Sequence, residues 1–442
     1  MSQRITLMSM PEEIIEAIGT ALRPTLRFYS EDYYANPTLT ENHQALENHR
    51  ALSCLSRVSK ELRRITLPIL YHTIPSTPAK LLSVLADNPD LASLVKDIDI
   101  SPNPIPSPIF HPVLEAISSR ITLQPSFKES LIHASFSGAS HSMRYSAQMA
   151  LYTLLLPKLR AVTYGVDGMV DDLCLTTIFC GNAHVRADTS AVLPPVLREI
   201  RLRSTNTGGF RPILDVDESF FQTAEILQGL SIGWFPRQVQ PTLISGLPLK
   251  HIDLIDSSID STDIIGLLQY TFQLRTLRII GGYLSCNTDQ LANFNIVGNY
   301  LRQYGHKLEE LVLEPNGLYR SVTKLGSLRE LAELKKLKLR QQMIRVQEPT
   351  PDESDPDAVE HGAPTLSQVL PVSLEYLHLL LCTEDVENLD DEICELIDPG
   401  GEMTKLRYIE MERSQPFTHD ATLLGFAEFH DPHQHRVVLT KT

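Results

Sequence analysis

The sequence predicts an α/β chain in which a small all-helical module, residues 1–75, is followed by an irregular solenoid of repeats, residues 76–442, with a parallel concave sheet. Two observations predict this fold class. An apolar pattern typical of one strand recurs ten times between Val95 and Met411, and helical periodicity precedes most of the copies. Before the first copy the chain instead carries two amphipathic stretches with apolar residues at helical spacing.

The clearest copy of the repeated pattern runs from Leu308 to Asn316, with the sequence LEELVLEPN. Its apolar residues at the first, fourth and sixth positions are expected to point into a shared core, and the Asn to cap backbone groups at the following turn. This pattern is the strand half of a leucine-rich repeat, which contributes one strand per repeat to a stacked horseshoe. A single copy arises by chance in a leucine-rich helix, whereas ten in succession favour true repeats.

The other nine copies lie on both sides of this one. They place apolar residues at Val95, Ile98 and Ile100; Leu159, Val162 and Tyr164; Leu197, Ile200 and Leu202; Leu227, Leu230 and Ile232; Leu249, Ile252 and Leu254; Leu274, Leu277 and Ile279; Leu334, Leu337 and Leu339; Leu374, Leu377 and Leu379; and Leu406, Ile409 and Met411. Successive copies begin about 22 to 64 residues apart, compared with about 20 to 29 in regular leucine-rich repeats. The repeats are therefore degenerate and carry insertions.

Composition and charge narrow the partners that we expect. The net charge of -15 disfavours nucleic acid and anionic membranes, because both attract basic surfaces. The six cysteines show no paired spacing, which is typical of reduced thiols. No apolar run reaches the roughly 18 residues of a membrane span, and residues 1–10 lack the apolar core of a signal peptide. We therefore expect a soluble protein of the cytoplasm, the nucleus or both, with no membrane and no nucleic-acid partner.

Two amphipathic segments make up the N-terminal module. The first covers residues 10–22 and begins with Pro11, a favourable residue in a first helical turn, and the second covers residues 51–67. The polar, tyrosine-rich residues between them, 23–50, are expected to form an inserted loop. Because two short helices cannot bury both apolar stripes alone, they must pack on each other, on the repeats or on a partner.

These segments resemble an F-box. The resemblance lies in MPEEII at residues 10–15 and LSCLSRVSKELR at residues 52–63, and the following LPILYHTI resembles the segment that joins F-box to repeats in fungal proteins. It implies a three-helix module that docks on the Skp adaptor of a cullin-based ubiquitin ligase. The adaptor contacts that it implies are Pro11, Ile14, Ile15, Leu52, Leu55, Val58 and Leu62. The inserted loop is longer than the usual connection, and Leu62 stands where many F-boxes have Trp.

The segments around the strands carry further expectations. Residues 78–94 are predicted to form a helix broken near Asn88-Pro89. The long gap before the second copy is expected to hide an eleventh strand near residues 131–136. Residues 348–364 are acidic and rich in proline, with no apolar period, which predicts a disordered loop between two repeats. Residues 436–440 are expected to form a terminal strand.

The sequence carries no motif for catalysis. It has no nucleophile motif, phosphate-binding glycine loop or metal-ligand spacing. The histidines from His430 to His435 are interpreted as part of a flexible tail rather than an open metal site, since no partner ligands are spaced for a tetrahedral set. The acidic pairs Asp171-Asp172 and Asp390-Asp391 are interpreted as helix starts. We therefore expect no enzyme activity, no cofactor and no metal.

What remains is a binding surface on the repeats. Residues that alternate with the core positions should point out of the concave side of the sheet. The substrate-binding residues expected there are Arg201, Arg203, Arg278, Lys336, Lys338, Arg340, Tyr376 and Tyr408. Three of these cations lie together beside the two aromatic residues, which suits an acidic or phosphorylated peptide; the alternative is that the charges only solvate the sheet.

These features give a functional hypothesis. The chain would be the substrate-recognition subunit of a Skp-cullin-F-box type ubiquitin ligase, tethered to the Skp-type adaptor and cullin core by its N-terminal helices. An unknown protein substrate would bind on the repeats. The alternative is a non-catalytic repeat scaffold for protein–protein interaction, in which the N-terminal helices only cap the solenoid. Binding of the adaptor separates the two.

Overall fold

The computed structural model is a mixed α/β protein that divides into two compact units, Met1–Gly233 and Trp234–Thr442. In the N-terminal unit the structure describes residues 10–23, 43–75, 79–100, 107–120, 123, 125–135, 141–166, 198–204 and 229–233. In the C-terminal unit it describes residues 248–255, 261–283, 294–316, 324–344, 364–380, 386–413, 415–431 and 435–441. The expected acidic loop, 348–364, lies outside the described residues except for Pro364.

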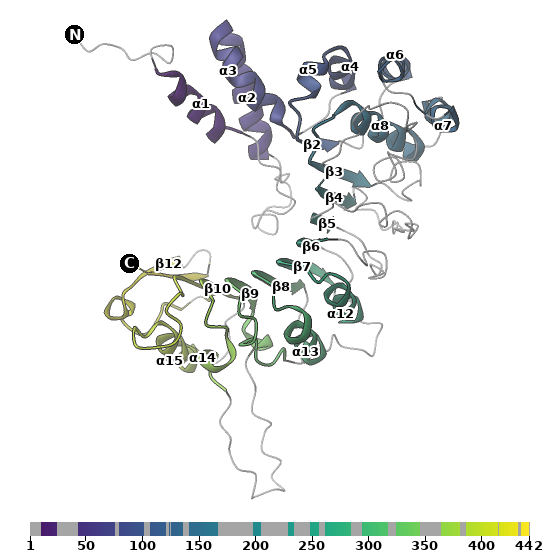
Figure 1. The fold of residues 1–442 in the computed structure, drawn as a ribbon. Coiled ribbons are helices and arrows are strands. Elements are labelled where there is room, and N and C mark those ends of the chain that lie inside the picture. The colour runs from purple at the N-terminus through teal and green to yellow at the C-terminus, as the bar shows by residue number, and fades with distance from the viewer. Residues whose placement is uncertain are drawn as a thin grey trace, which may run out of the picture. The chain divides into compact units, whose positions relative to one another are not determined.

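Three helices form the beginning of the N-terminal unit (Figure 1). They are α1 (Glu12–Ala21), α2 (His43–Val58) and α3 (Lys60–His72). The predicted boundaries of the loop 23–50 are wrong, since residues 43–50 belong to α2. The rest of that loop, residues 24–42, lies outside the described part of the chain.

The single helix predicted over residues 51–67 is also wrong. The chain breaks at Ser59, which is extended and separates α2 from α3. The Ser59 hydroxyl accepts a hydrogen bond from the Leu62 amide at 3.1 Å and so caps α3. The helical apolar period continues across the break, which explains why the sequence pattern does not reveal it.

The three helices bury apolar residues against one another. Ile15 of α1 joins Leu62 and Ile65 of α3 in one buried cluster. At Gly19 of α1 an added Cβ would lie 2.7 Å from Cδ1 of Ile69 in α3, so only a glycine leaves that side chain where it is. The first and third helices therefore approach closely although about 40 residues separate them in the chain.

Five parallel strands follow in the N-terminal unit. They are β1 (Thr73–Ile74), β2 (Asp97–Ile100), β3 (Ala161–Val166), β4 (Glu199–Ser204) and β5 (Gly229–Gly233), and each pairs with the next. The helices among them are α4 (Ala79–Asp87), α5 (Pro89–Ala92), α6 (Ser107–Ser118), α7 (Pro125–Ser135) and α8 (His141–Leu155). The predicted helix break is confirmed, because α4 ends at Asp87 and α5 begins at Pro89.

The eleventh strand predicted near residues 131–136 is wrong. Residues 131–135 form the end of α7, and Leu131 is fully buried there; residue 136 lies outside the described part of the chain. A short apolar run fits a buried helix face as well as a strand, so periodicity alone could not distinguish the two.

The C-terminal unit contains a mixed sheet. Its parallel strands are β6 (His251–Ile255), β7 (Thr276–Tyr283), β8 (Glu310–Asn316), β9 (Lys336–Arg340), β10 (Tyr376–Leu380) and β11 (Tyr408–Glu412). Two antiparallel strands complete it: β13 (Arg436–Lys441) pairs with β11, and β12 (Phe426–Asp431) pairs with β13. The predicted terminal strand at residues 436–440 is confirmed as β13, whereas β12 was not expected.

Each of the ten segments that carry the repeated pattern forms a parallel strand. The register aligns their core positions across the C-terminal sheet. Leu277, Leu311, Leu337, Leu377 and Ile409 lie opposite one another on consecutive strands, and all five are completely buried. This alignment explains the repeat, because a one-residue slip would place the apolar row on the other face.

Helices cover that apolar face in the C-terminal unit. They are α12 (Ser261–Tyr270), α13 (Phe294–Tyr304), α14 (Leu366–Val369) and α15 (Val386–Ile397), with short 3-10 helices η4 (Gln341–Met343) and η5 (Ala421–Leu424). The α-helices lie on one side of the strands (Figure 1). At Gly298 of α13 an added Cβ would lie 1.7 Å from the Leu325 carbonyl oxygen, and Arg302 donates to the same oxygen at 3.0 Å. The helix α13 therefore packs directly against the backbone at Leu325.

A buried ion pair connects α15 to the segment that follows β11. Asp390 of α15 lies 2.5 Å from an Arg413 guanidinium nitrogen, with both side chains essentially inaccessible to solvent. The same carboxylate accepts hydrogen bonds from the Thr418 amide and hydroxyl at 2.8 and 2.7 Å. Asp390 lies inside α15, so its interpretation as a helix start is wrong; Asp171-Asp172 lies outside the described residues. The pairing holds the segment after β11 against the helix.

Candidate functional site

The side of the C-terminal sheet that faces away from α12 to α15 carries polar residues, and we call it the polar face. The register arranges them in two rows that cross all eight strands. The first row is His251, Thr276, Glu310, Lys336, Tyr376, Tyr408, Thr440 and Ala427. The second row is Asp253, Arg278, Val312, Lys338, His378, Glu410, Val438 and Phe429. Successive members come from adjacent strands, so side chains distant in sequence meet here.

Two of the expected cations have acidic partners on this face. Arg278 lies 2.8 Å from Glu310 and 3.9 Å from Asp253. Lys338 lies 3.0 Å from Glu314. Each pair joins neighbouring strands, because parallel register brings their side chains within reach. Two of the four cations expected on this sheet are therefore compensated by carboxylates.

Two stacked tyrosines form the centre of the face. The rings of Tyr376 and Tyr408 lie 4.7 Å apart and are inclined by only 8°. Both hydroxyls donate to Oε2 of Glu410, at 3.0 and 3.2 Å. Arg436 contacts the other carboxylate oxygen at 2.6 Å and donates to the Tyr408 hydroxyl at 3.1 Å. This network fixes both rings, which gives a rigid aromatic platform of the kind that interfaces use as an anchor.

A buried histidine lies beside the platform. His378 is 3% exposed, and in the described part of the chain neither ring nitrogen has a hydrogen-bond partner. Its Nε2 lies 3.6 Å from Glu410 and 3.8 Å from Glu412, which is too long for a hydrogen bond. Burial, together with the smaller effect of the nearby charges of Lys338 and Arg436, lowers the pKa of His378 to about 3. The imidazole is therefore neutral at physiological pH.

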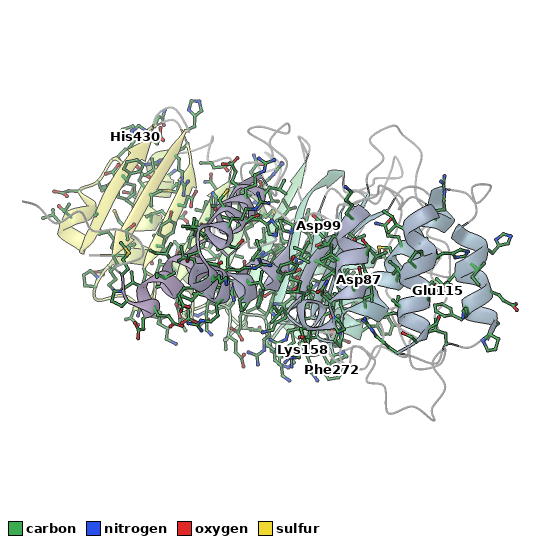
Figure 2. The ribbon with its side chains drawn as sticks, turned by 90° about the horizontal axis from the view of Figure 1, so that it is seen from above. Asp87, Asp99, Glu115, Lys158, Phe272 and His430 are labelled. Atoms are coloured by element: carbon green, nitrogen blue, oxygen red, sulfur yellow. The ribbon has the colours of Figure 1, made fainter. Side chains whose placement is uncertain are left out.

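The N-terminal sheet has a polar face of different character. Arg201 of β4 is buried and lies 3.4 Å from Asp97 and 2.8 Å from Glu199. Burial raises the pKa of Asp97 to about 6; Glu199 and Asp99 add to the rise, and Arg201 opposes it. Asp99 itself lies on β2 and is 4% exposed (Figure 2). Arg201 is thus enclosed by carboxylates rather than presented to a ligand.

The three remaining substrate-binding residues that we expected differ in how exposed they are. Lys336 is exposed beside Tyr376 on the neighbouring strand, and Arg340 is half-buried at the end of β9. Arg203 lies in β4, but its side chain falls outside the described part. The structure therefore brings Lys336, Tyr376 and Tyr408 together as the accessible part of the predicted surface.

The residues implied as adaptor contacts fall into a buried group and an accessible group. Ile15, Leu52 and Leu62 are buried inside the helical module. Pro11 is exposed, Leu55 is half-buried, and Ile14 and Val58 are 48% and 63% exposed. The first three stabilise the module, and a partner can contact only the other four without moving the helices.

The members of the polar face on β12 and β13 were not predicted from the sequence. Arg436 reaches Tyr408 and Glu410 because β13 returns antiparallel alongside β11. No local pattern indicates that pairing, which depends on tertiary folding alone. His430 lies in the strand β12 (Figure 2), so the prediction of a flexible tail is wrong at this residue. No group of three or more metal-binding side chains occurs among the residues that the structure describes. Residues 432–434 of the expected histidine tail lie outside that part.

No protein-family model matches this sequence, and no curated protein matches it. Among the described residues, no helix combines the length and apolar character that crossing a membrane requires. Two surfaces of the chain, on the helical module and on the polar face, offer chemistry from which a function can be inferred.

Proposed function

We propose that this chain is the substrate-recognition subunit of a Skp-cullin-F-box type ubiquitin ligase and does not itself catalyse. The main support for the proposal is that the apolar residues of the N-terminal module form two sets, one buried and one exposed. One set is buried between helices, and a second set, which includes Ile14 and Val58, is exposed to solvent. A module that only needed to fold would not require the second set, whereas a docking module would.

The exposed set suits an adaptor. Ile14 lies on α1 and Val58 ends α2, and an ion pair between Glu12 and Arg64, at 2.6 Å, ties α1 to α3. Burial of the exposed side chains by a partner would contribute about 25 cal/mol for each Å² of apolar surface removed from water. Docking of the preformed helices would need no large rearrangement.

The polar face of the C-terminal unit suits a protein substrate. The platform of Tyr376 and Tyr408 is fixed by Glu410 and flanked by the exposed Lys336. Because Arg278 and Lys338 already have acidic partners, a strongly acidic or phosphorylated peptide would have to displace them. Aromatic contact with a substrate of mixed charge is the mode that this surface favours. A bound substrate would then be held at high effective concentration near the ligase core.

The test is co-purification of the full chain with a Skp adaptor. The double variant Ile14→Asp and Val58→Asp should abolish binding while circular dichroism stays unchanged, since both residues are exposed. Val84→Asp in α4 introduces the same charge at another exposed apolar position of the N-terminal unit and should bind normally. If the wild-type chain is folded and never binds the adaptor, the ligase proposal is wrong.

The second candidate is a non-catalytic scaffold whose N-terminal helices cap the repeats. It is favoured by the pairing of β1, which directly follows α3, with β2 of the sheet. That pairing makes the helical module structurally continuous with the strands, as a cap would be. A cap predicts that removal of the Ile14 and Val58 side chains changes neither adaptor binding nor stability.

A further inference from the structure

The strand β12 forms one end of the C-terminal sheet. The order there is β11, β13, β12, and six residues of β12 pair with β13 in unbroken register. Among the described residues no strand pairs with the other side of β12. Alternate backbone N–H and C=O groups on that side are therefore available to a further strand.

This edge carries only part of the usual protection against pairing. Its sequence, FAEFHD, contains the charged residues Glu428 and Asp431 but no Lys or Pro, and its pairing with β13 shows no bulge. Ala427, Glu428 and Phe429 are all exposed, and Phe429 is 63% exposed. A regular edge that lacks a bulge and proline and carries an exposed aromatic ring is the type of surface that can take an additional strand.

We propose that β12 pairs with β12 of a second copy of this chain, antiparallel and centred on Phe429. In that register Phe429 faces Phe429 of the partner, and Glu428 faces His430 of the other chain. The two-fold axis makes the second contact twice, so each carboxylate meets an imidazole.

The choice of a second copy rests on this self-complementarity. Antiparallel pairing about Phe429 also places the small Ala427 opposite Asp431, so no two carboxylates face each other. An unrelated peptide would need the same order of residues to match the edge equally well. The resulting contact would join two C-terminal sheets into one continuous sheet. It does not depend on the proposed ligase function.

Charge exchange tests the pairing. The full-length wild-type chain should dimerise in a concentration-dependent manner during analytical ultracentrifugation. Glu428→Lys and His430→Glu should each raise the dimer dissociation constant about tenfold or more, because each puts like or unmatched groups opposite one another twice. An equimolar mixture of the two variants should recover dimers, since the exchanged residues then face each other in a heterodimer. Leu423→Lys, at an exposed apolar residue of η5, is the matched control and should dimerise normally.

Glu428 also accepts a hydrogen bond from the Phe417 amide at 3.1 Å, so folding of Glu428→Lys needs to be verified by circular dichroism. Recovery in the mixture cannot arise from a folding defect, which keeps the test decisive. A folded wild-type chain that stays monomeric at all concentrations, or variants that dimerise as well as wild type, would overturn the proposal.

Cross-linking tests the register. Directly opposite residues in antiparallel strands have Cα atoms about 4.5 to 5.5 Å apart, within the range of a disulfide. Phe429→Cys should therefore give a reducible dimer above the wild-type background. Ala427→Cys should not, because its counterpart lies more than about 10 Å away along the strand. Equal cross-linking at both positions would contradict pairing about Phe429.

Discussion

In the N-terminal unit Arg201 is buried between Asp97 and Glu199, with 9% of its side chain exposed, whereas in the C-terminal unit Arg278 keeps 37% of its side chain exposed beside Glu310. Both arginines occupy the same place in the repeated strand pattern, one residue after a core position. The buried guanidinium has lost its water and depends on its carboxylates, while the other retains much of its hydration. The same type of arginine–carboxylate ion pair is therefore expected to contribute differently to the stability of the two sheets.

The apolar sides of the two sheets, in contrast, are alike. Ile200 of β4 and Leu337 of β9 fill equivalent core positions and are 1% and 0% exposed. The repeat thus sets a common interior, and only the polar faces differ. Substitutions at equivalent positions in the two units can test this distinction.

The largest difference is expected for arginine removal in the N-terminal sheet. Arg201→Met leaves Asp97 and Glu199 without their cation, which should cost roughly 3 to 5 kcal/mol of local stability. Hydrogen exchange of the β4 amides, which measures opening of that strand, should accelerate accordingly. The loss should shrink at pH 5, because Asp97, whose pKa is already about 6, can then take up a proton. Unchanged protection of β4 would show that the carboxylates are solvated without Arg201.

Truncation of the shared core should affect both units alike. Ile200→Ala and Leu337→Ala each remove a fully buried side chain, and each should cost about 3 kcal/mol through lost burial and the remaining cavity. Exchange protection should fall around β4 in the first variant and around β9 in the second. A difference between them much larger than about 2 kcal/mol would argue against an equivalent interior.

Acid should weaken the C-terminal sheet through His378. The unfolded histidine, with a pKa near 6.5, takes up a proton as the pH falls, whereas in the fold burial holds the pKa at about 3. The folded state therefore binds fewer protons between these values, and stability decreases as the pH falls below about 6.5. Lowering the pH from 8 to 5 should cost roughly 2 kcal/mol. The variant His378→Gln should lose this dependence in exchange measurements on β10.

Acid should instead stabilise the N-terminal sheet through Asp97. The pKa of Asp97 is raised from 3.8 to about 6 in the fold, so the folded state binds more protons between these values. Its contribution to stability therefore increases as the pH falls through about 6. Equal acid-induced loss of protection in β2 and β10 would contradict both assignments.

The smallest effect is expected for Arg278→Met. The Arg278 side chain is partly exposed, and such ion pairs contribute about 0.2 to 1 kcal/mol. Exchange of the β7 amides should change little, and added salt should reduce even that change. An effect as large as that of Arg201→Met would mean that exposure does not explain the difference between the two arginines.

Much of the strand pattern could be predicted from the sequence. The apolar triplets placed the ten parallel strands β2 to β11 but not the short β1, because alternation along a strand is a local property that needs several residues to appear. The short helix α7 was mistaken for a strand, and the break at Ser59 was missed, since apolar periodicity does not define boundaries or distinguish short buried segments. The residues of the polar face on β6 to β11 could be listed from the alternation, but not those on β12 and β13, nor the ion pairs among them.

The sequence by itself determined which residues face the core, since the two-residue alternation of a strand and the apolar period are encoded locally. Tertiary structure alone decided which polar side chains are paired or desolvated. Glu314 meets Lys338 through parallel register, Arg436 reaches Glu410 through an antiparallel return, and His378 becomes buried between strands. Pairing and desolvation depend on neighbours that distant segments supply, and local sequence holds no record of those neighbours.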